Sequence, residues 1–397
     1  MFGTVLLVVA TLMHLYVFGR AASVPLMKRR VPRWLLFAAG VFLWAGFLVA
    51  RFPGHAGTGA IAAPLEFFGM NWMGALFLTS ICLLAMDIVT GFGYILPRLA
   101  PSLRGWALLA GAVLSAFALF QGMRPPVVED RAVRLPGLPD AMDGTVIVAM
   151  SDMHLGSQLG NHWLENRVAQ VQALRPDLVV LLGDIFEGHG PPRRELITGL
   201  GKLSAPLGVF AVPGNHESHG FGGGNGGLPI EESGIQVLRN RWVEVRPGLV
   251  LAGVDDLTAA RRRAGQGSDV AGGAGDTIGR ALALRPPGAA ILLSHTPWHA
   301  EKAAAAGASL MLSGHTHGGG QIWPLGYLVR RIYPLVDGDH DVNGMKVIVS
   351  RGAGTWGPRM RLWRPAQILR ITLRAPGHVQ AQRRDQGPPD TSSGDGR

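Results

Sequence analysis

Aspartate, asparagine and histidine residues recur along the chain at the points where short apolar runs end. Eight residues share this placement: Asp152, His154, Asp184, Asn215, His216, His295, His315 and His317. Their oxygen and imidazole atoms suit Mn, Fe, Zn or Mg, and the single cysteine, Cys82, excludes a thiolate cluster. The set is too large for one ion, whereas two ions that share a carboxylate would use it. A pair of divalent ions stabilises both the attacking and the leaving oxygen in phosphoryl transfer.

Short apolar runs that end in turns are typical of strands buried on both faces of a sheet. Such runs precede the polar residues at 145–150, 178–182, 209–212, 249–254, 290–293 and 310–312. Between the first two runs, Leu164, Val168 and Val171 recur at helical spacing, and Pro176 then ends the pattern. Strand–helix–strand alternation predicts an α/β sheet, and ligands bind such sheets beyond the carboxyl ends of the strands. We therefore expect the polar residues to meet at one edge.

The polar residues fall into motifs that occur in a fixed order. The motifs are Asp152-Met153-His154, Gly183-Asp184, Gly214-Asn215-His216-Glu217, His295 and Gly314-His315-Thr316-His317. In this order they resemble the calcineurin-like metallophosphoesterase family, and segments 318–322 and 349–355 resemble its bacterial membrane-anchored branch. The resemblance covers about residues 145–373. It implies an α/β calcineurin-like phosphoesterase sandwich of two packed β-sheets flanked by helices, with the metals between the sheet edges.

The resemblance also implies two divalent metal ions as cofactors and a role for each polar residue. Asp152, His154 and His317 would hold one ion, Asn215, His295 and His315 would hold the other, and Asp184 would bridge them. The two ions together would activate the water that attacks phosphorus. His216 would protonate the leaving oxygen instead of binding metal. Glu187 and Glu217 are rival partners for orienting that histidine.

The first third of the chain has the composition of a membrane region. Charged residues make up 16% of the whole chain and hydrophobic residues 48%. Soluble domains are about a quarter charged, so this composition points to membrane-buried segments. Apolar stretches at residues 2–19, 34–50, 67–86 and 106–121 are each near the roughly 20 residues that cross a bilayer as a helix. They predict a four-helix transmembrane region over residues 1–123.

The distribution of charge predicts how this region is oriented. Residues 1–123 carry eight basic and two acidic residues, in a chain of net charge +10. Most of these basic residues lie in the first and third connections, which the positive-inside rule places in the cytoplasm. Nucleic-acid binding needs a basic stripe with interleaved aromatic residues, so no nucleic-acid partner is expected. We predict a multi-pass cell-membrane protein with an extracytoplasmic catalytic domain, an orientation that one span fewer would invert.

The rest of the chain divides into three parts. Residues 124–143 are proline-rich and charged, and predict a linker that holds one early strand at 127–135. Residues 144–375 form the expected metallophosphoesterase domain. Residues 376–397 have almost no core-forming side chains and predict a disordered tail.

Together these features predict a membrane-anchored, dinuclear metal-dependent phosphohydrolase that cleaves a phosphate ester or anhydride. The membrane location brings lipid-linked substrates, such as a phosphodiester or a pyrophosphate, within reach. Two alternatives stay open: a membrane binding or sensing module with a non-catalytic metal-binding domain, and a transporter whose chemistry lies in the helices. The intact ligand set argues against the first, and the scarcity of ionisable residues in the apolar stretches argues against the second.

Overall fold

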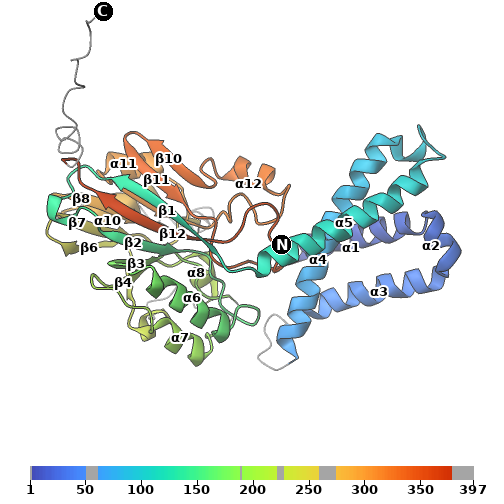
Figure 1. Cartoon of the computed structure of the whole chain (residues 1–397), viewed down its shortest axis with the longest axis horizontal. Coiled ribbons are helices and arrows are strands. Elements are labelled where there is room, and N and C mark those ends of the chain that lie inside the picture. The colour runs from blue at the N-terminus through green and yellow to red at the C-terminus, as the bar shows by residue number, and fades with distance from the viewer. Residues whose placement is uncertain (1, 51–60, 188–189, 221–227, 259–273, 378–397) are drawn as a thin grey trace, which may run out of the picture.

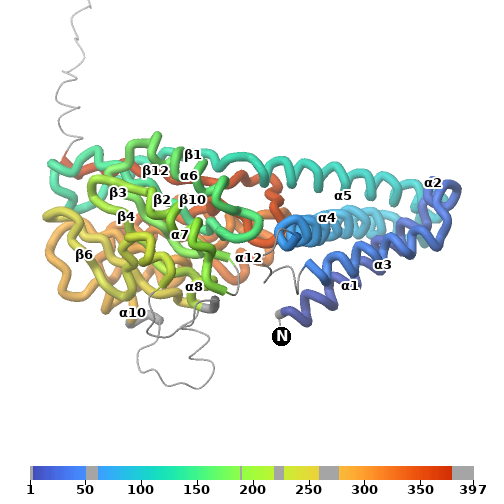
Figure 2. Tube along the Cα trace, turned by 90° about the horizontal axis from the view of Figure 1, so that it is seen from below, coloured from blue at the N-terminus to red at the C-terminus, as the bar shows by residue number. Residues whose placement is uncertain are grey.

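The computed structural model describes residues 2–50, 61–187, 190–220, 228–258 and 274–377. A bundle of long helices from the N-terminal third extends from one side of a larger domain built on two β-sheets (Figure 1). The view from below shows the bundle and the two-sheet domain side by side (Figure 2).

The first sheet has six strands in the order β1-β12-β2-β3-β4-β5. Their bounds are Val127–Arg134 (β1), Gln367–Arg374 (β12), Val146–Met150 (β2), Leu178–Leu181 (β3), Val209–Ala211 (β4) and Gln236–Val237 (β5). Strands β2 to β5 pair in parallel, so their carboxyl ends meet at one edge. Strand β12 is antiparallel to β2 and parallel to β1.

The second sheet also has six strands, in the order β10-β11-β9-β8-β7-β6. Their bounds are Gly338–Val342 (β10), Met345–Val349 (β11), Leu310–Ser313 (β9), Ala289–Leu293 (β8), Leu249–Gly253 (β7) and Arg241–Arg246 (β6). Strands β7, β8, β9 and β11 are parallel, and the edge strands β6 and β10 are antiparallel to their neighbours. Two mixed sheets flanked by helices confirm the predicted α/β sandwich.

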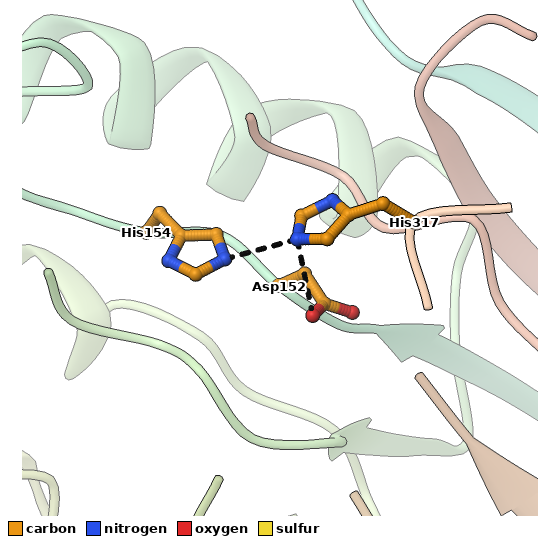
Figure 3. A group of neighbouring side chains, drawn as sticks. All are labelled: Asp152, His154 and His317. Atoms are coloured by element: carbon orange, nitrogen blue, oxygen red, sulfur yellow. Dashed lines mark hydrogen bonds and ion pairs between the residues drawn. The ribbon is translucent and has the colours of Figure 1, made fainter. Parts of the chain in front are cut away.

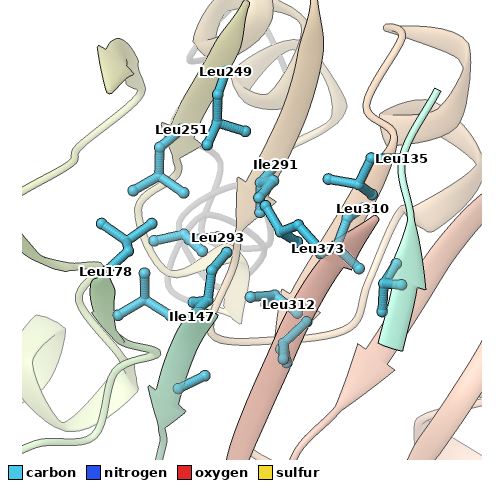
Figure 4. Close-up of a cluster of buried hydrophobic side chains, with 14 of the residues drawn as sticks. Leu135, Ile147, Leu178, Leu249, Leu251, Ile291, Leu293, Leu310, Leu312 and Leu373 are labelled. Carbon is cyan, nitrogen blue, oxygen red and sulfur yellow. The ribbon is translucent and has the colours of Figure 1, made fainter. Parts of the chain in front are cut away.

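The sheets pack face to face through apolar side chains (Figure 4). Ile147 and Leu178 of the first sheet and Leu251, Ile291 and Leu312 of the second are each at most 1% exposed. Burying one such side chain contributes about 1.5–3 kcal/mol to stability. This core fixes the strand ends, so the loops that follow them start from rigid positions.

Helices cover the outer faces of both sheets. Helices α6 (Asn161–Ala173) and α7 (Arg194–Leu200) pack on the first sheet, and α10 (Ala274–Leu282) and α11 (Ala300–Ala305) pack on the second. The predicted helical spacing is confirmed in α6, where Leu164, Val168 and Val171 are buried against the first sheet.

The helix bundle corrects the predicted number of membrane spans. Among the described residues, three helices are long and apolar enough to cross a membrane: α1 (Phe2–Ala21), α4 (Ala62–Val89) and α5 (Ala100–Met123). These helices mark a membrane protein. The second predicted stretch forms α3 (Arg33–Val49), which has only 17 residues. At about 1.5 Å per residue this helix is shorter than a hydrocarbon core of about 30 Å. The prediction of four full-length membrane spans is therefore wrong. A short helix, α2 (Pro25–Arg30), links α1 to α3.

The sandwich and the bundle are joined by packed contacts. Ile322, Met360 and Leu362 of the sandwich form one buried cluster with Leu78 of α4 and Ala118 of α5. Nearby, the Ser157 hydroxyl donates a hydrogen bond to the Glu66 carboxylate of α4. The loops around the carboxyl ends of β2 and β9 therefore lie against the membrane helices.

The structure describes the predicted linker in full and the predicted tail only in part. The predicted linker, residues 124–143, contains β1, which pairs along its length with β12 and so belongs to the first sheet. Most of the predicted tail, from residue 378 on, lies outside the described residues.

Candidate dinuclear metal centre

The loops after β2 and β9 bring three candidate ligands together (Figure 3). Asp152 and His154 follow β2, and His317 follows β9. His317 Nε2 lies 3.5 Å from Asp152 Oδ1 and 3.2 Å from His154 Nε2. One ligand atom of each residue lies within 4.8 Å of the others, and all three side chains are buried. This group can surround one cation.

A second group gathers from the loops after β3, β4, β8 and β9. His295 Nε2 lies 3.2 Å from Asp184 Oδ2, 3.1 Å from Asn215 Oδ1 and 3.1 Å from His315 Nδ1. Asn215 begins α8 (Asn215–Gly220), directly after β4. One ligand atom of each of Asp184, His295 and His315 also lies within 4.8 Å of the others.

Asp184 lies between the two groups. Its Oδ2 atom is 3.2 Å from His295 Nε2 and 4.0 Å from His154 Nε2. With His154 and His216 it forms a third possible ligand group. A carboxylate shared by two clusters is what a pair of nearby metal ions requires.

The backbone is strained where these side chains are attached. Asp152, His154, Asp184, His315 and His317 have φ values of 52°, 48°, 50°, 69° and 48°. Residues other than glycine rarely adopt this left-handed conformation, which costs about 1–3 kcal/mol at each position. Such strain gathers at functional sites because the surrounding strands hold it in place. Here it lets five residues from three loops present their side chains to one small volume.

Gly214 shows how tightly these loops pack. A Cβ atom at Gly214 would lie 2.1 Å from Asp184 Oδ1 and 2.3 Å from Asp184 N. We expect Gly214→Ala to displace the Asp184 loop, to lower the free energy of unfolding by about 2 kcal/mol or more, and to reduce bound metal. Thermal unfolding and elemental analysis of the purified protein measure both effects.

A matched control for this change lies in α10. A Cβ atom added at Gly279 would meet open space, and the φ of Gly279 is not in the left-handed region. Gly279→Ala should therefore leave bound metal unchanged and keep or raise stability, since alanine favours a helix by about 0.5–1 kcal/mol. Wild-type metal content in Gly214→Ala would contradict the proposed closeness of these loops.

Buried charges shift the histidine pKa values in opposite directions. Burial lowers the pKa of His317 to about 3 and that of His315 to about 4. Burial also acts on His154 and His295, but the carboxylates of Glu187 and Asp184 outweigh it and raise their pKa values to about 9 and about 10. Burial opposes ionisation of Asp184, yet the adjacent histidines, His295 foremost, hold its pKa well below the usual range. A cation that binds here must displace protons from His154 and His295.

The residues present fit a pair of divalent cations. Asp152 Oδ1 and His317 Nδ1 are buried and have no hydrogen-bond partner among the described residues. Leaving a buried polar atom unsatisfied costs about 1–3 kcal/mol, and a cation would satisfy the carboxylate oxygen. Carboxylates, one amide and imidazoles form a donor set that suits Mn, Fe, Zn or Mg.

The structure places the two rival glutamates differently. Glu187 Oε2 lies 2.6 Å from His154 Nδ1 and 3.4 Å from His216 Nδ1. The His216 ring in turn lies edge-on to His154, with centroids 4.8 Å apart. Glu187 therefore contacts both the candidate ligand and the candidate proton donor.

Glu217 instead holds the loops after β3 and β4 together. It is 0% exposed, and its carboxylate accepts hydrogen bonds from the backbone N–H groups of Asp184, Ile185, Phe186 and Gly214 at 2.8–3.0 Å. Burial raises the pKa of Glu217 to about 7, with the Asp184 charge as the next cause. The geometry therefore favours Glu187 over Glu217 as the partner of His216.

Sequence reasoning missed the groups that orient the ligand rings. His315 Nε2 lies 2.7 Å from the Tyr333 hydroxyl, and His295 Nδ1 lies 2.7 Å from the Leu182 carbonyl oxygen. Such hydrogen bonds fix which ring nitrogen faces the metal. No motif marks them, because one partner is a lone tyrosine and the other is a backbone carbonyl.

A buried arginine was also missed. Arg361 is 0% exposed, and its Nη2 donates to the carbonyl oxygens of Arg351, Gly352 and Gly354 at 2.7–3.1 Å. Burial lowers the pKa of Arg361 to about 10. Its backbone N–H donates to the Ala118 carbonyl of α5, so this segment ties the loop beside Asp152 to a membrane helix.

Comparison with known proteins identifies the family of the chain. Residues 145–319 match the calcineurin-like phosphoesterase family. A transmembrane protein with metallophosphoesterase domain from Danio rerio is 34% identical over 280 residues, which are 68% of this chain and 62% of that protein. An uncharacterized metallophosphoesterase from Aquifex aeolicus is 34% identical over 260 residues, 63% of this chain and 93% of that protein.

A crystal structure of a dimetal phosphatase from Danio rerio is 16% identical, with a TM-score of 0.37 over 58% of this chain and 99% of that chain. The chain thus spans less than two thirds of the transmembrane relative from Danio rerio and nearly the whole of the bacterial one. The family match over the motif-bearing residues, together with the identity to the Aquifex protein, shows that the chain belongs to the calcineurin-like metallophosphoesterase family.

Proposed function

We propose that this protein is a membrane-anchored, dinuclear metal-dependent phosphoesterase. The observation that carries the proposal is the pair of buried ligand groups that meet at Asp184. Family membership supports the reaction class, because the names of the transmembrane relative from Danio rerio and of the Aquifex aeolicus protein both contain metallophosphoesterase.

The ligand roles follow from the two groups. We assign Asp152, His154 and His317 to one ion, Asn215, His295 and His315 to the other, and Asp184 to both. When bound, such a pair of ions supplies Lewis-acid stabilisation of the charge on a transferring phosphoryl group.

The chain's own residues would handle the leaving group. His216 lies at the edge of the first ligand group with one ring nitrogen near Glu187. A protonated His216 would give its proton to the leaving oxygen, and Glu187 would hold the ring in position. Trp356, whose ring lies edge-on to His216 with centroids 6.4 Å apart, is 44% exposed, so a substrate bound beside His216 would be able to contact it.

The test is hydrolysis by the purified full-length protein in detergent. Metals are stripped, and Mn, Fe, Zn or Mg is added back singly, with a monoester and a diester of the same chromogenic phenol as substrates. We expect metal-dependent turnover that Asp184→Asn greatly reduces, and the preferred ester would define the reaction further. Two bound ions per chain with no turnover of either ester would favour a non-catalytic binding module instead.

We further propose that the catalytic domain lies outside the cytoplasm. Figure 1 shows α2 and the connection from α4 to α5 at the end of the bundle far from the sandwich. Basic residues gather at that end. Residues 28–30 of α2 are all basic. Arg20 and Arg104 also lie there and form ion pairs with Asp87 at 2.7 Å and 2.8 Å. The positive-inside rule places this end in the cytoplasm. Although α3 is short, it runs from α2 back towards the start of α4 (Figure 1), so the shorter helix does not invert the proposed orientation.

The orientation is tested with a reporter enzyme that folds only outside the cytoplasm. Fused after Arg397, it should be active, and it should be inactive when inserted between α4 and α5. The reverse pattern would place the catalytic domain inside the cell.

Membrane anchoring also brings lipid-linked phosphate esters or anhydrides within reach as substrates. The packing of Met360 and Leu362 against α4 and α5 supports this narrower proposal, because it places the loops beside the metal centre close to the bilayer.

A further inference from the structure

A cavity of about 340 Å³ opens next to the candidate metal centre. One wall is the loop 318–320, which directly follows the candidate ligand His317. A second wall is α12 (Gly326–Ile332), which contributes Tyr327 and Arg330, and a third contains Trp363. Helix α12 is fixed relative to the metal centre, because Tyr333 at its end is hydrogen-bonded to a candidate ligand histidine. The cavity is large enough for a small-molecule group.

The far wall of this cavity reaches the membrane helices. The Trp363 ring contacts Phe117 of α5, with centroids 5.6 Å apart. Leu362, which also lines the cavity, belongs to the buried cluster with Leu78 of α4 and Ala118 of α5. Figure 2 shows α12 on the side of the sandwich that faces the bundle. The cavity is therefore bounded on one side by the loop beside His317 and on another by two residues, Leu362 and Trp363, that pack against membrane-spanning helices.

Helix α12 has the composition of a segment that lies at a membrane surface. None of its residues is buried, and Tyr327, Leu328 and Ile332 are 69%, 67% and 59% exposed. Its other long side chains include Arg330 and Arg331. Exposed apolar side chains next to arginines are unfavourable in water but favourable where lipid tails meet anionic head groups.

We propose that this cavity binds a membrane lipid that carries a phosphate group. The phosphate would lie at the end of the cavity next to His317, on the side of the metal centre, with Arg330 and Arg364 supplying positive charge, and the acyl chain would run along Trp363 towards α5. The chemistry of the walls indicates this occupant. The guanidinium groups of Arg330 and Arg364 suit a phosphate, and the Trp363 ring, which contacts Phe117 of α5, suits an acyl chain. The inference rests on the proposed function and deepens it, because it narrows the substrate to lipid phosphates. Arg364 is already paired with Asp337, so Arg330 is the residue to test.

Binding is measured without catalysis by photo-crosslinking. The full-length protein is placed in phosphatidylcholine nanodiscs that contain phosphatidic acid with a diazirine in its acyl chain, and labelled peptides are identified by mass spectrometry. We expect labels to concentrate on the cavity residues. Arg330→Gln should lower this labelling by about tenfold, the effect of losing one charge-assisted contact. Arg331→Gln removes the same charge from the same helix outside the cavity lining and should leave the labelling unchanged.

Three outcomes would overturn the lipid site. Labels could be no more frequent in the cavity than on α1, α3, α4 and α5. Arg331→Gln could lower labelling as much as Arg330→Gln. Inorganic phosphate could displace the label as effectively as unlabelled phosphatidic acid, which would mean a site for free phosphate instead of lipid.

A kinetic arm separates this inference from the proposed function. Hydrolysis of methyl nitrophenyl phosphate and of dodecyl nitrophenyl phosphate cleaves the same P–O bond. Water adds to phosphorus and nitrophenolate leaves. We expect Trp363→Ala to lower kcat/KM for the dodecyl ester by about tenfold through KM, because the alkyl chain loses an aromatic contact, with the methyl ester unchanged. Leu284→Ala, at a position 97% exposed outside the cavity, is the control. If every variant hydrolysed the two esters at equal rates, the lipid site would be refuted and the proposed phosphoesterase function would stand. No turnover of either ester would refute the phosphoesterase function.

Discussion

Asp184→Asn is expected to lower turnover by about a thousandfold, roughly 4 kcal/mol of transition-state stabilisation. Asp184 is the carboxylate that lies between the two ligand groups, 3.2 Å from His295 Nε2 and 4.0 Å from His154 Nε2. An amide has one oxygen and no charge, so it cannot serve two cations. We also expect bound metal to fall from two ions per chain to one or fewer, measured by elemental analysis beside the rate assay.

The same variant should remain folded. Asp184 Oδ1 accepts a hydrogen bond of 2.9 Å from the His216 backbone N–H, which an asparagine oxygen can still accept. Asp255→Asn is the matched control, because Asp255 also follows a strand, β7, but pairs with Arg239 and Asn240. Full activity and two bound ions in Asp184→Asn would remove the basis for a shared carboxylate.

The candidate ligands were predictable because local rules and the sheet topology agree. Continuous apolar runs predicted strands buried on both faces, and parallel strands place their carboxyl ends at one edge. Asp152 follows β2 of the first sheet and His317 follows β9 of the second, so their meeting also depends on how the two sheets pack against each other. The structure brings their side chains to 3.5 Å.

The choice between Glu187 and Glu217 could not be made from the sequence. Both lie within three residues of a motif residue, and either could face His216. The two glutamates differ in the direction of their side chains. The Glu217 carboxylate accepts hydrogen bonds from four backbone N–H groups of the tight turns after β3 and β4. Which carboxylate satisfies those donors depends on three-dimensional loop packing.

The number of membrane spans was overestimated for a related reason. Apolar composition identifies a helix, but its usable length depends on where it begins and ends. Pro32 precedes α3 as its N-cap, and the helix is 17 residues long. The contact between the sandwich and the bundle was equally invisible, because Arg361 and Met360 lie in a segment with no motif.

His216→Ala is the second large effect, an expected loss of about 10²–10⁴ in kcat with both ions still bound. The loss should depend on the leaving group. A nitrophenyl ester releases a stable anion and needs little proton transfer, so its rate should fall least, and an alkyl ester should lose most. Rates for a series of esters of rising leaving-group basicity check this, and an equal loss across the series would mean that His216 binds the phosphoryl group instead of protonating its leaving oxygen.

The two glutamates should then separate by what their loss affects. Glu187→Gln keeps the fold but weakens the contact to His154 Nδ1 and the hold on His216, so metal affinity should fall by about 10–100-fold. At saturating metal the remaining loss in kcat should again be largest for poor leaving groups, which a purely structural role would not produce. Glu217→Gln should instead lower the melting temperature, since an amide cannot accept all four backbone N–H bonds without bringing its own NH₂ group against a donor. If Glu217→Gln changed the leaving-group dependence and Glu187→Gln did not, the two assignments would have to be exchanged.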